Sequence, residues 1–205
     1  MKKLNLLKSL ILVIFVLTGT TKAFAYAETG QMLYTSSPVA VSVEPLIVNN
    51  SGTINPATGE ISDTLNASFN LQTNDPDNYK FVMYSKIQTT GGEVSAFDED
   101  GYIFFGNIDT LPTVTAVENA KTGNGTNANV IGYKLGTTVG NNTSVTYDDE
   151  SSYGESYIIK LLNSATSGTV EQAITGNAKA KTYSNSQDTS GTYRVTVYVT
   201  AIQNN

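Results

Sequence analysis

Two short runs of acidic residues are the densest groups of chemically useful side chains in this 205-residue sequence. Asp98-Glu99-Asp100 is followed by Gly101, and the second run is Asp148-Asp149-Glu150. Neighbouring carboxylates can bind Ca²⁺, but neither run has the spacing of a twelve-residue EF-hand loop. Adjacent acids also keep an exposed edge from sticking to other molecules. We therefore expect solvated loops at both places and assign no metal site.

Few of the remaining residues are candidates for a catalytic role. A glycosidase needs two carboxyl groups at a set separation beside an aromatic groove, and the chain has 12 Tyr but no Trp and no recognisable motif. It has no Cys and no His, which excludes thiolate nucleophiles, Ser-His-Asp triads and the usual zinc and haem ligands. We predict no catalytic residue, no cofactor and a non-enzymatic role.

The charge distribution argues against nucleic acid as a partner. Four of the 12 Lys and Arg residues lie in the first 25 positions, so the rest of the chain holds eight basic and 18 acidic residues. A chain with that balance repels phosphate groups. The eight basic residues are also scattered singly, so no basic patch is expected.

The N-terminal segment 1–25 has the pattern of a secretory signal peptide. Lysines are followed by an apolar run over 10–17 and by small residues ending at Ala25, with a second cleavage possibility after Ala27. The apolar run is far shorter than the roughly 20 residues that span a bilayer. We expect a secreted protein whose mature chain has no membrane insertion.

Alternating apolar and polar residues, bounded by turn residues, predict a chain built from strands. No stretch has a convincing helical stripe longer than about two turns. Gly101–Phe105 is unusually aromatic and is expected inside. The clearest strands are expected at Val39–Val43, Leu65–Leu71, Tyr79–Ile87, Tyr102–Phe105, Ser156–Leu162 and Tyr193–Ile202. Several short strands in about 180 residues favour an all-β fold, a β-sandwich with Greek-key connections.

The first of these strands has one apolar face. Val39, Val41 and Val43 share that face, and Pro45, which cannot donate to a ladder, ends the regular pairing. The leader at 26–37 is expected to be unpaired or mobile. Such a strand could swing out of its own domain.

The C-terminal strand alternates in the same way. Its apolar face carries Tyr193, Val195, Val197 and Val199. A strand that runs so close to the end of a chain must be held in a sheet.

Three stretches resemble the major pilin subunits of the alpha class of chaperone-usher fimbriae, the colonisation-factor-like pilins. They are Val39-Ala-Val-Ser-Val-Glu-Pro45, Phe69-Asn-Leu-Gln-Thr-Asn-Asp75 and Gly191-Thr-Tyr-Arg-Val-Thr-Val197. The resemblance implies an immunoglobulin-like sandwich that lacks its last strand and is completed by the N-terminal donor strand of a neighbouring subunit. This chain departs from the pattern in the 12 residues before the strand and in longer loops between 93 and 142.

These observations together predict a fimbrial structural subunit that polymerises by donor-strand complementation and supports adhesion at the cell surface. The expected divisions are 1–25 signal peptide, 26–37 leader, 38–48 donor strand and 49–205 sandwich. The resemblance implies that the donor residues are Val39, Val41, Val43 and Ile47. It also implies that the terminal strand lines the groove that receives them, with Tyr193, Val195, Val197 and Val199. The resemblance implies identical or related pilin subunits, a periplasmic chaperone and an outer-membrane usher as partners, with a host surface receptor as a further one.

Two other readings stay open at this point. A stand-alone secreted module could hold carbohydrate or a host protein with loops 93–100 and 121–129, and its N-terminal strand would fold into its own sheet. A matrix protein could instead polymerise by strand addition without a chaperone or usher. The departures from the pilin pattern also fit a tip subunit.

Overall fold

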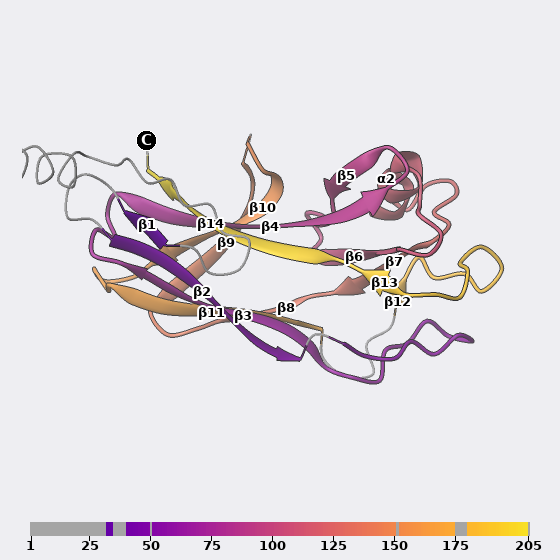
Figure 1. Cartoon of the computed structure of the whole chain (residues 1–205), viewed down its shortest axis with the longest axis horizontal. Coiled ribbons are helices and arrows are strands. Elements are labelled where there is room, and N and C mark those ends of the chain that lie inside the picture. The colour runs from indigo at the N-terminus through magenta and orange to yellow at the C-terminus, as the bar shows by residue number, and fades with distance from the viewer. Residues whose placement is uncertain (1–31, 35–39, 50, 151, 175–179, 205) are drawn as a thin grey trace, which may run out of the picture.

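The computed structural model of the chain describes residues 32–34, 40–49, 51–150, 152–174 and 180–204. Within these ranges it is an all-β protein with antiparallel sheets packed together, as expected, and one short helix (Figure 1). The expected signal peptide lies outside the described residues.

The first sheet has five strands, all antiparallel. In spatial order they are β1 (Met32–Tyr34), β2 (Ala40–Asn49), β3 (Leu65–Thr73), β11 (Ser167–Ile174) and β8 (Gly136–Val139). The N-terminal strands β1 and β2 therefore lie at one edge of this sheet.

The second sheet faces the first across the core. Its order is β14 (Thr196–Gln203), β4 (Tyr79–Thr89), β10 (Gly154–Leu161) and β9 (Thr143–Glu150), with β5 (Gly92–Ser95) added to β4. A third sheet consists of β12 (Ala180–Lys181), β7 (Val130–Lys134), β6 (Tyr102–Asn107) and β13 (Tyr193–Arg194). Since β13 runs into β14 after one residue, the C-terminal segment belongs to both sheets.

The main core fills the space between these sheets. Leu71 of β3, Phe81 and Met83 of β4, and Val199 of β14 are completely buried in it. Side chains from strands far apart in the sequence thus meet in one cluster, which is how the apolar alternation of the strands stabilises the sandwich.

The helix α2 (Val114–Thr122) was not foreseen from the sequence. The Thr113 side chain accepts a hydrogen bond from the Ala116 N–H at its start, and Gly123 ends it with a φ of 72°. Ala116, Val117 and Ala120 pack in a second, smaller core with Phe104 and Val130. The helix covers one end of the molecule rather than a functional site.

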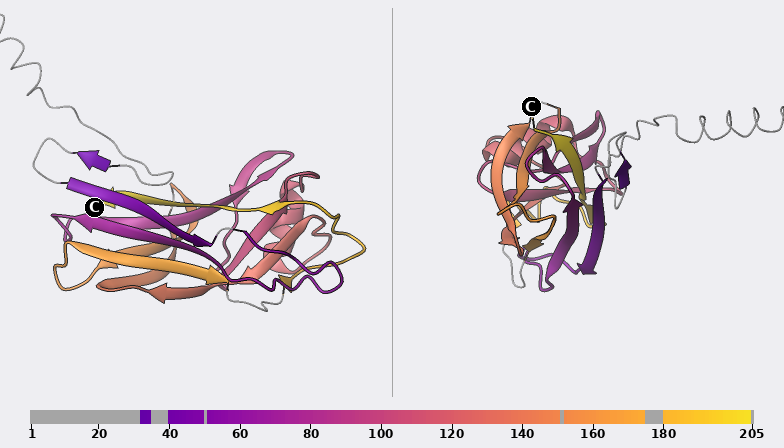
Figure 2. Two further views of the ribbon diagram at one scale, coloured as in Figure 1. Left: turned by 60° about the horizontal axis from the view of Figure 1, so that its bottom comes forward. Right: turned by 90° about the vertical axis from the view of Figure 1, so that its left-hand side faces the viewer.

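Each segment expected to be a strand overlaps one in the structure, with modest differences at the ends. The prediction that the aromatic segment Gly101–Phe105 lies inside the protein is confirmed in part. Ile103 and Phe104 are buried, whereas Tyr102 and Phe105 are partly exposed. Figure 2 shows an elongated molecule, with β2 starting near the C-terminus at one end and the loops around 51–64 and 183–192 at the other.

Candidate functional site

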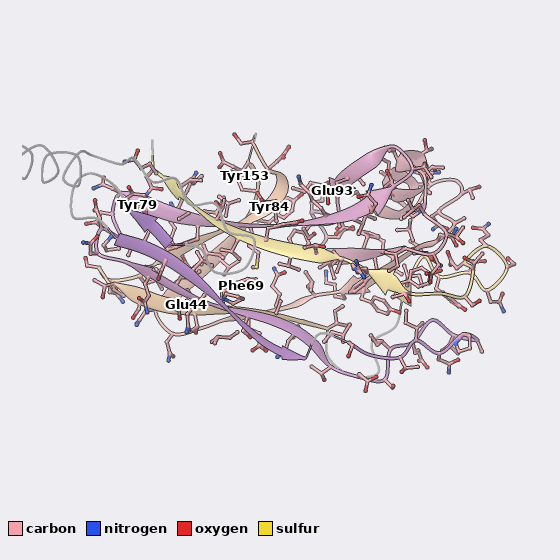
Figure 3. All side chains as sticks on the ribbon, in the orientation of Figure 1. Glu44, Phe69, Tyr79, Tyr84, Glu93 and Tyr153 are labelled. Carbon is pink, nitrogen blue, oxygen red and sulfur yellow. The ribbon has the colours of Figure 1, made fainter. Side chains whose placement is uncertain are left out.

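The proposed donor strand lies in the sheet of its own chain. Val41 is opposite Thr73 and Val43 is opposite Leu71 in the β2–β3 ladder. Both valine side chains are 2% exposed, while Glu44 projects into solvent (Figure 3). The valine face therefore fits a slot between the two sheets of the sandwich, and here that slot belongs to the same chain.

The structure describes the other two proposed donor residues, Val39 and Ile47, only in part. Val39 lies outside the described residues, and for Ile47 the structure gives the backbone pairing with Ala67 but no side chain. Part of the leader, Met32–Tyr34, is paired with β2 opposite residues 40–42, where an unpaired segment was expected. The rest of 26–37 lies outside the described residues.

Pro45 divides β2 into a part before it, Ala40–Glu44, and a shorter part after it, Leu46–Asn49. It stands opposite Phe69 in the ladder but has no N–H to donate. On the other side of β2, the described residues of β1 pair with residues 40–42, so this part of β2 has a neighbouring strand on both sides. Pro45 therefore removes one possible backbone donor between this doubly paired part and Leu46–Asn49.

The C-terminal strand β14 is an edge strand. Among the described residues it pairs with β4 alone, and it lies beside β2 without pairing with it. Val199 is completely buried in the main core, which also contains Val41 and Val43. Val197 and Val195 are only partly buried. One half of the apolar face of this strand is therefore covered and the other half is open.

A small cavity of about 120 Å³ lies at the open half. Its walls come from strands of all three sheets and are mostly apolar. They are formed by Leu65, Asn66, Ala67, Ile103, Phe105, Leu135, Gln172, Ile174, Val195 and Val197. The open half of the β14 face thus borders a cavity instead of a packed core.

A larger cavity of about 730 Å³ adjoins it and shares Leu65, Phe105 and Val195 with it. The larger cavity is lined by the loop after β2, by residues 183–195 and by Ile131 and Tyr133. We call the two cavities together the open groove. Of the four residues predicted to line a groove, Tyr193, Val195 and Val197 line it, and Val199 is inside the core instead.

Tyrosine hydroxyls hold the walls of the larger cavity. Tyr133 donates to the Gly59 carbonyl at 2.8 Å, and Tyr193 donates to the Thr189 carbonyl at 2.8 Å. Tyr183 donates to the Pro56 carbonyl. Burial raises the pKa values of Tyr133 and Tyr193 above the ordinary value of a tyrosine. These hydroxyls are engaged by the protein's own backbone, so they organise the loops.

The first acidic run is paired with lysines. Lys181 Nζ lies 3.2 Å from Asp98 Oδ2 and 3.9 Å from Asp100 Oδ2, and it also stands 4.4 Å from the centroid of the Tyr102 ring. Lys134 donates to the Asp100 carbonyl. Asp98 is 4% exposed, so this part of the run is not the solvated loop expected from the sequence.

The second acidic run is the last part of β9 and is paired with β10, so it is not the loop expected from the sequence. Glu150 forms an ion pair with Lys80 at 3.1 Å. No group of three or more acidic, His or Cys side chains is close enough to hold a metal ion in the part of the chain that the structure describes.

One polar residue of the mostly apolar groove, Gln172, was not predicted from the sequence. Gln172 lies on β11, which was not among the expected strands, and its side chain is on the core face between Val170 and Ile174. Val170, Gln172 and Ile174 are spaced as on one face of a strand, but Gln172 is polar, so the apolar face that would have indicated a strand is interrupted.

The loops that were candidates for a binding module have other structures. Part of 93–100 is the strand β5, and the start of 121–129 is the end of α2. The open groove is formed by other loops, chiefly 51–65 and 183–195.

Comparisons with known proteins give no family. Within the described ranges, the helix is too short and too polar to cross a membrane. No protein-family model, no curated protein and no solved structure matches this chain.

Proposed function

We propose that this protein is a structural subunit of an extracellular fimbria, in which the N-terminal strand of one copy completes the sandwich of the next. The observation that carries the proposal is the open groove beside the edge strand β14. There Val195 and Val197 are partly exposed and line a cavity whose walls come from all three sheets. The role is non-catalytic: the function is assembly and adhesion.

An added strand would satisfy two needs of this groove. It would cover the apolar side chains, and fully burying one valine is worth roughly 1.5–3 kcal/mol. It would also pair with the outer N–H and C=O groups of β14, which pairs with β4 alone among the described residues. An edge strand with such groups is a template for another chain.

The N-terminal strand is the donor that the sequence offers. The segment before Pro45 has one valine face, and Val41 and Val43 already fit between the two sheets of this sandwich. Exchange of an identical element between copies costs little, because the packing that the strand gives up in one copy is restored in the next. In the donor, the part of β2 before Pro45 would leave the sheet of its own chain, with the missing N–H of Pro45 at the boundary.

The positions of donor and groove favour a filament. β2 begins at the end of the molecule where the C-terminus lies, and the larger cavity is formed by loops at the opposite end (Figure 2). A contact between opposite ends of identical copies is heterologous and does not close on itself. Repetition of it produces a linear fibre along the long axis.

The resemblance to alpha-class pilins supplies the rest of the proposal. It implies export through a signal peptide, a periplasmic chaperone that protects the groove, an outer-membrane usher, and a host surface receptor for the finished fibre. Related pilin subunits would be the other occupants of the groove. The groove does not depend on this resemblance, since it follows from the fold.

The test is a pair of lysine substitutions in the mature chain that begins at residue 26. Val197→Lys puts a charge into the open groove, where the monomer can still solvate it but an incoming strand cannot. Thr196→Lys puts the same charge on the exposed neighbouring position. Electron microscopy of concentrated protein should show filaments for the native chain and Thr196→Lys only. Filaments of Val197→Lys would refute the groove.

A stand-alone binding module is the second candidate. Two observations favour it: β2 is paired within its own chain, and the larger cavity is lined by Tyr133, Tyr183 and Tyr193. This candidate requires a native chain that stays monomeric at every concentration, so the same experiment distinguishes the two.

A further inference from the structure

Gln172 is a buried polar residue that nothing in the described part of the chain satisfies. Its side chain is 3% exposed, and neither Oε1 nor Nε2 has a hydrogen-bond partner. Its backbone is paired on both sides, with Ala67 of β3 and with Thr137 of β8. The unmet hydrogen-bonding capacity therefore belongs to the side-chain amide alone.

An amide in this position destabilises the isolated chain. Burying an amide without a partner costs free energy, whereas an apolar side chain of the same shape at this place would add to the core. The neighbours of Gln172 on the core face of β11 are Val170 and Ile174, both buried. For the folded monomer by itself, an apolar residue would fit better here.

The location of Gln172 indicates what could satisfy it. The residue lines the smaller cavity of the open groove, together with Val195 and Val197 from the edge strand. The side chain borders that space although both of its amide atoms are buried, so the amide would change rotamer when a strand binds. The amide can donate and accept at the same time, and a peptide group of an extended strand offers one acceptor and one donor.

We infer that Gln172 anchors the incoming N-terminal strand of a second copy by hydrogen-bonding to its main chain. The inference rests on the proposed function, because the strand is the occupant of the same groove. The valines of that strand fill the apolar walls, and the amide fixes the strand at one point along the groove. Gln172 is thus the polar element of an otherwise apolar acceptor site.

The occupant has the right length for this role. The part of the mature chain before Pro45, 26–44, has 19 residues, and the edge segment from Tyr193 to Gln203 has 11, which at about 3.4 Å per residue corresponds to roughly 37 Å. A strand of that length spans both the covered and the open half of the β14 face and passes the cavity that Gln172 lines.

The test replaces Gln172 by Met, which keeps the unbranched shape and removes the amide. Gln88→Met is the matched control, since Gln88 is exposed on β4 and lines neither cavity of the open groove. Two quantities are measured on full-length mature chains: the melting temperature of dilute monomer by circular dichroism, and the critical concentration for filament growth by sedimentation.

The inference predicts two distinct changes. Gln172→Met should raise the monomer melting temperature by about 2 °C or more, because an unsatisfied amide is removed. It should also raise the critical concentration about fivefold, because the incoming strand loses its anchor. The variant is therefore a more stable monomer that assembles less well. Gln88→Met should change neither quantity.

Two other results would overturn the inference in distinguishable ways. If Gln172→Met filaments grow at the native critical concentration or below it, the anchoring role is refuted while the fimbrial function stands. If the native chain forms no filaments at all, the proposed function fails and the inference fails with it.

Discussion

Val43 of β2 lies opposite Leu71 of β3, and both side chains are buried in one core. The strand that we propose as a donor is therefore also part of the core of the isolated chain. A copy that gives its strand away uncovers this core, and the strand received from a neighbour must cover it again. The received strand must therefore cover both the open groove and the place beside β3 that the donated strand has left.

The double role of β2 predicts a clear stability effect. Val43→Ala should lower the free energy of unfolding of the monomer by about 1–3 kcal/mol, since it removes two buried methyl groups and leaves a cavity. Glu44→Ala, one position further on and exposed, should change it by less than about 0.5 kcal/mol. Urea denaturation of dilute protein measures both. Equal effects of the two substitutions would mean that β2 is not in its own sheet.

The loop wall of the larger cavity depends on Tyr133. Tyr133→Phe removes the hydrogen bond to the Gly59 carbonyl and should lower the free energy of unfolding by about 1 kcal/mol. Hydrogen exchange of amides in 52–61 should also become faster. Tyr102→Phe is the control, because it keeps the ring beneath Lys181. Unchanged exchange in Tyr133→Phe would show that the loop is held by other contacts.

Buried tyrosines make the fold sensitive to high pH. Burial, and next the charges of Glu155 and Asp149, raise the pKa of Tyr147 to about 12, above the ordinary value of 10.0. Burial also raises the pKa values of Tyr133 and Tyr157. Because the unfolded chain loses these protons first, the free energy of unfolding should be unaffected below about pH 10 and fall between about pH 10 and 12.

An alkaline titration followed by the absorbance of tyrosinate, combined with thermal melts, checks that expectation. Tyr147→Phe should make the decline in stability shallower, because one shifted group is removed. A native protein whose stability stays constant across this range of pH would contradict the assigned burial of these hydroxyls.

The fold class and most strands could be predicted from the sequence because alternating residues report directly on a two-faced strand. Tyr79–Ile87 and Tyr193–Ile202 are examples, and both form paired strands in the structure. The helix α2 escaped prediction because its buried face is made of Ala116, Val117 and Ala120, which give only a weak apolar stripe. Its clearest local signals were the cap residues Thr113 and Gly123.

The groove was predictable only in part. Val195 and Val197 could be placed on one face of a strand, but the opposite wall comes from Leu65 and Leu135, far away in the sequence. Nothing local relates these residues to β14. The pairing of β2 was likewise not predictable, since an alternating valine strand fits its own sheet and a neighbour's equally well.

Whether β2 leaves its own sheet is the central question, and one engineered crosslink tests it. Ser42 and Gln72 are opposite each other in the ladder, and their Cβ atoms are thus close enough for a disulfide. The chain has no Cys of its own, so Ser42→Cys with Gln72→Cys forms a single defined bond. Electron microscopy of the concentrated mature chain should show monomers while the disulfide is oxidised and filaments after its reduction. Filaments from the oxidised protein, or their absence after reduction, would contradict donation of this strand.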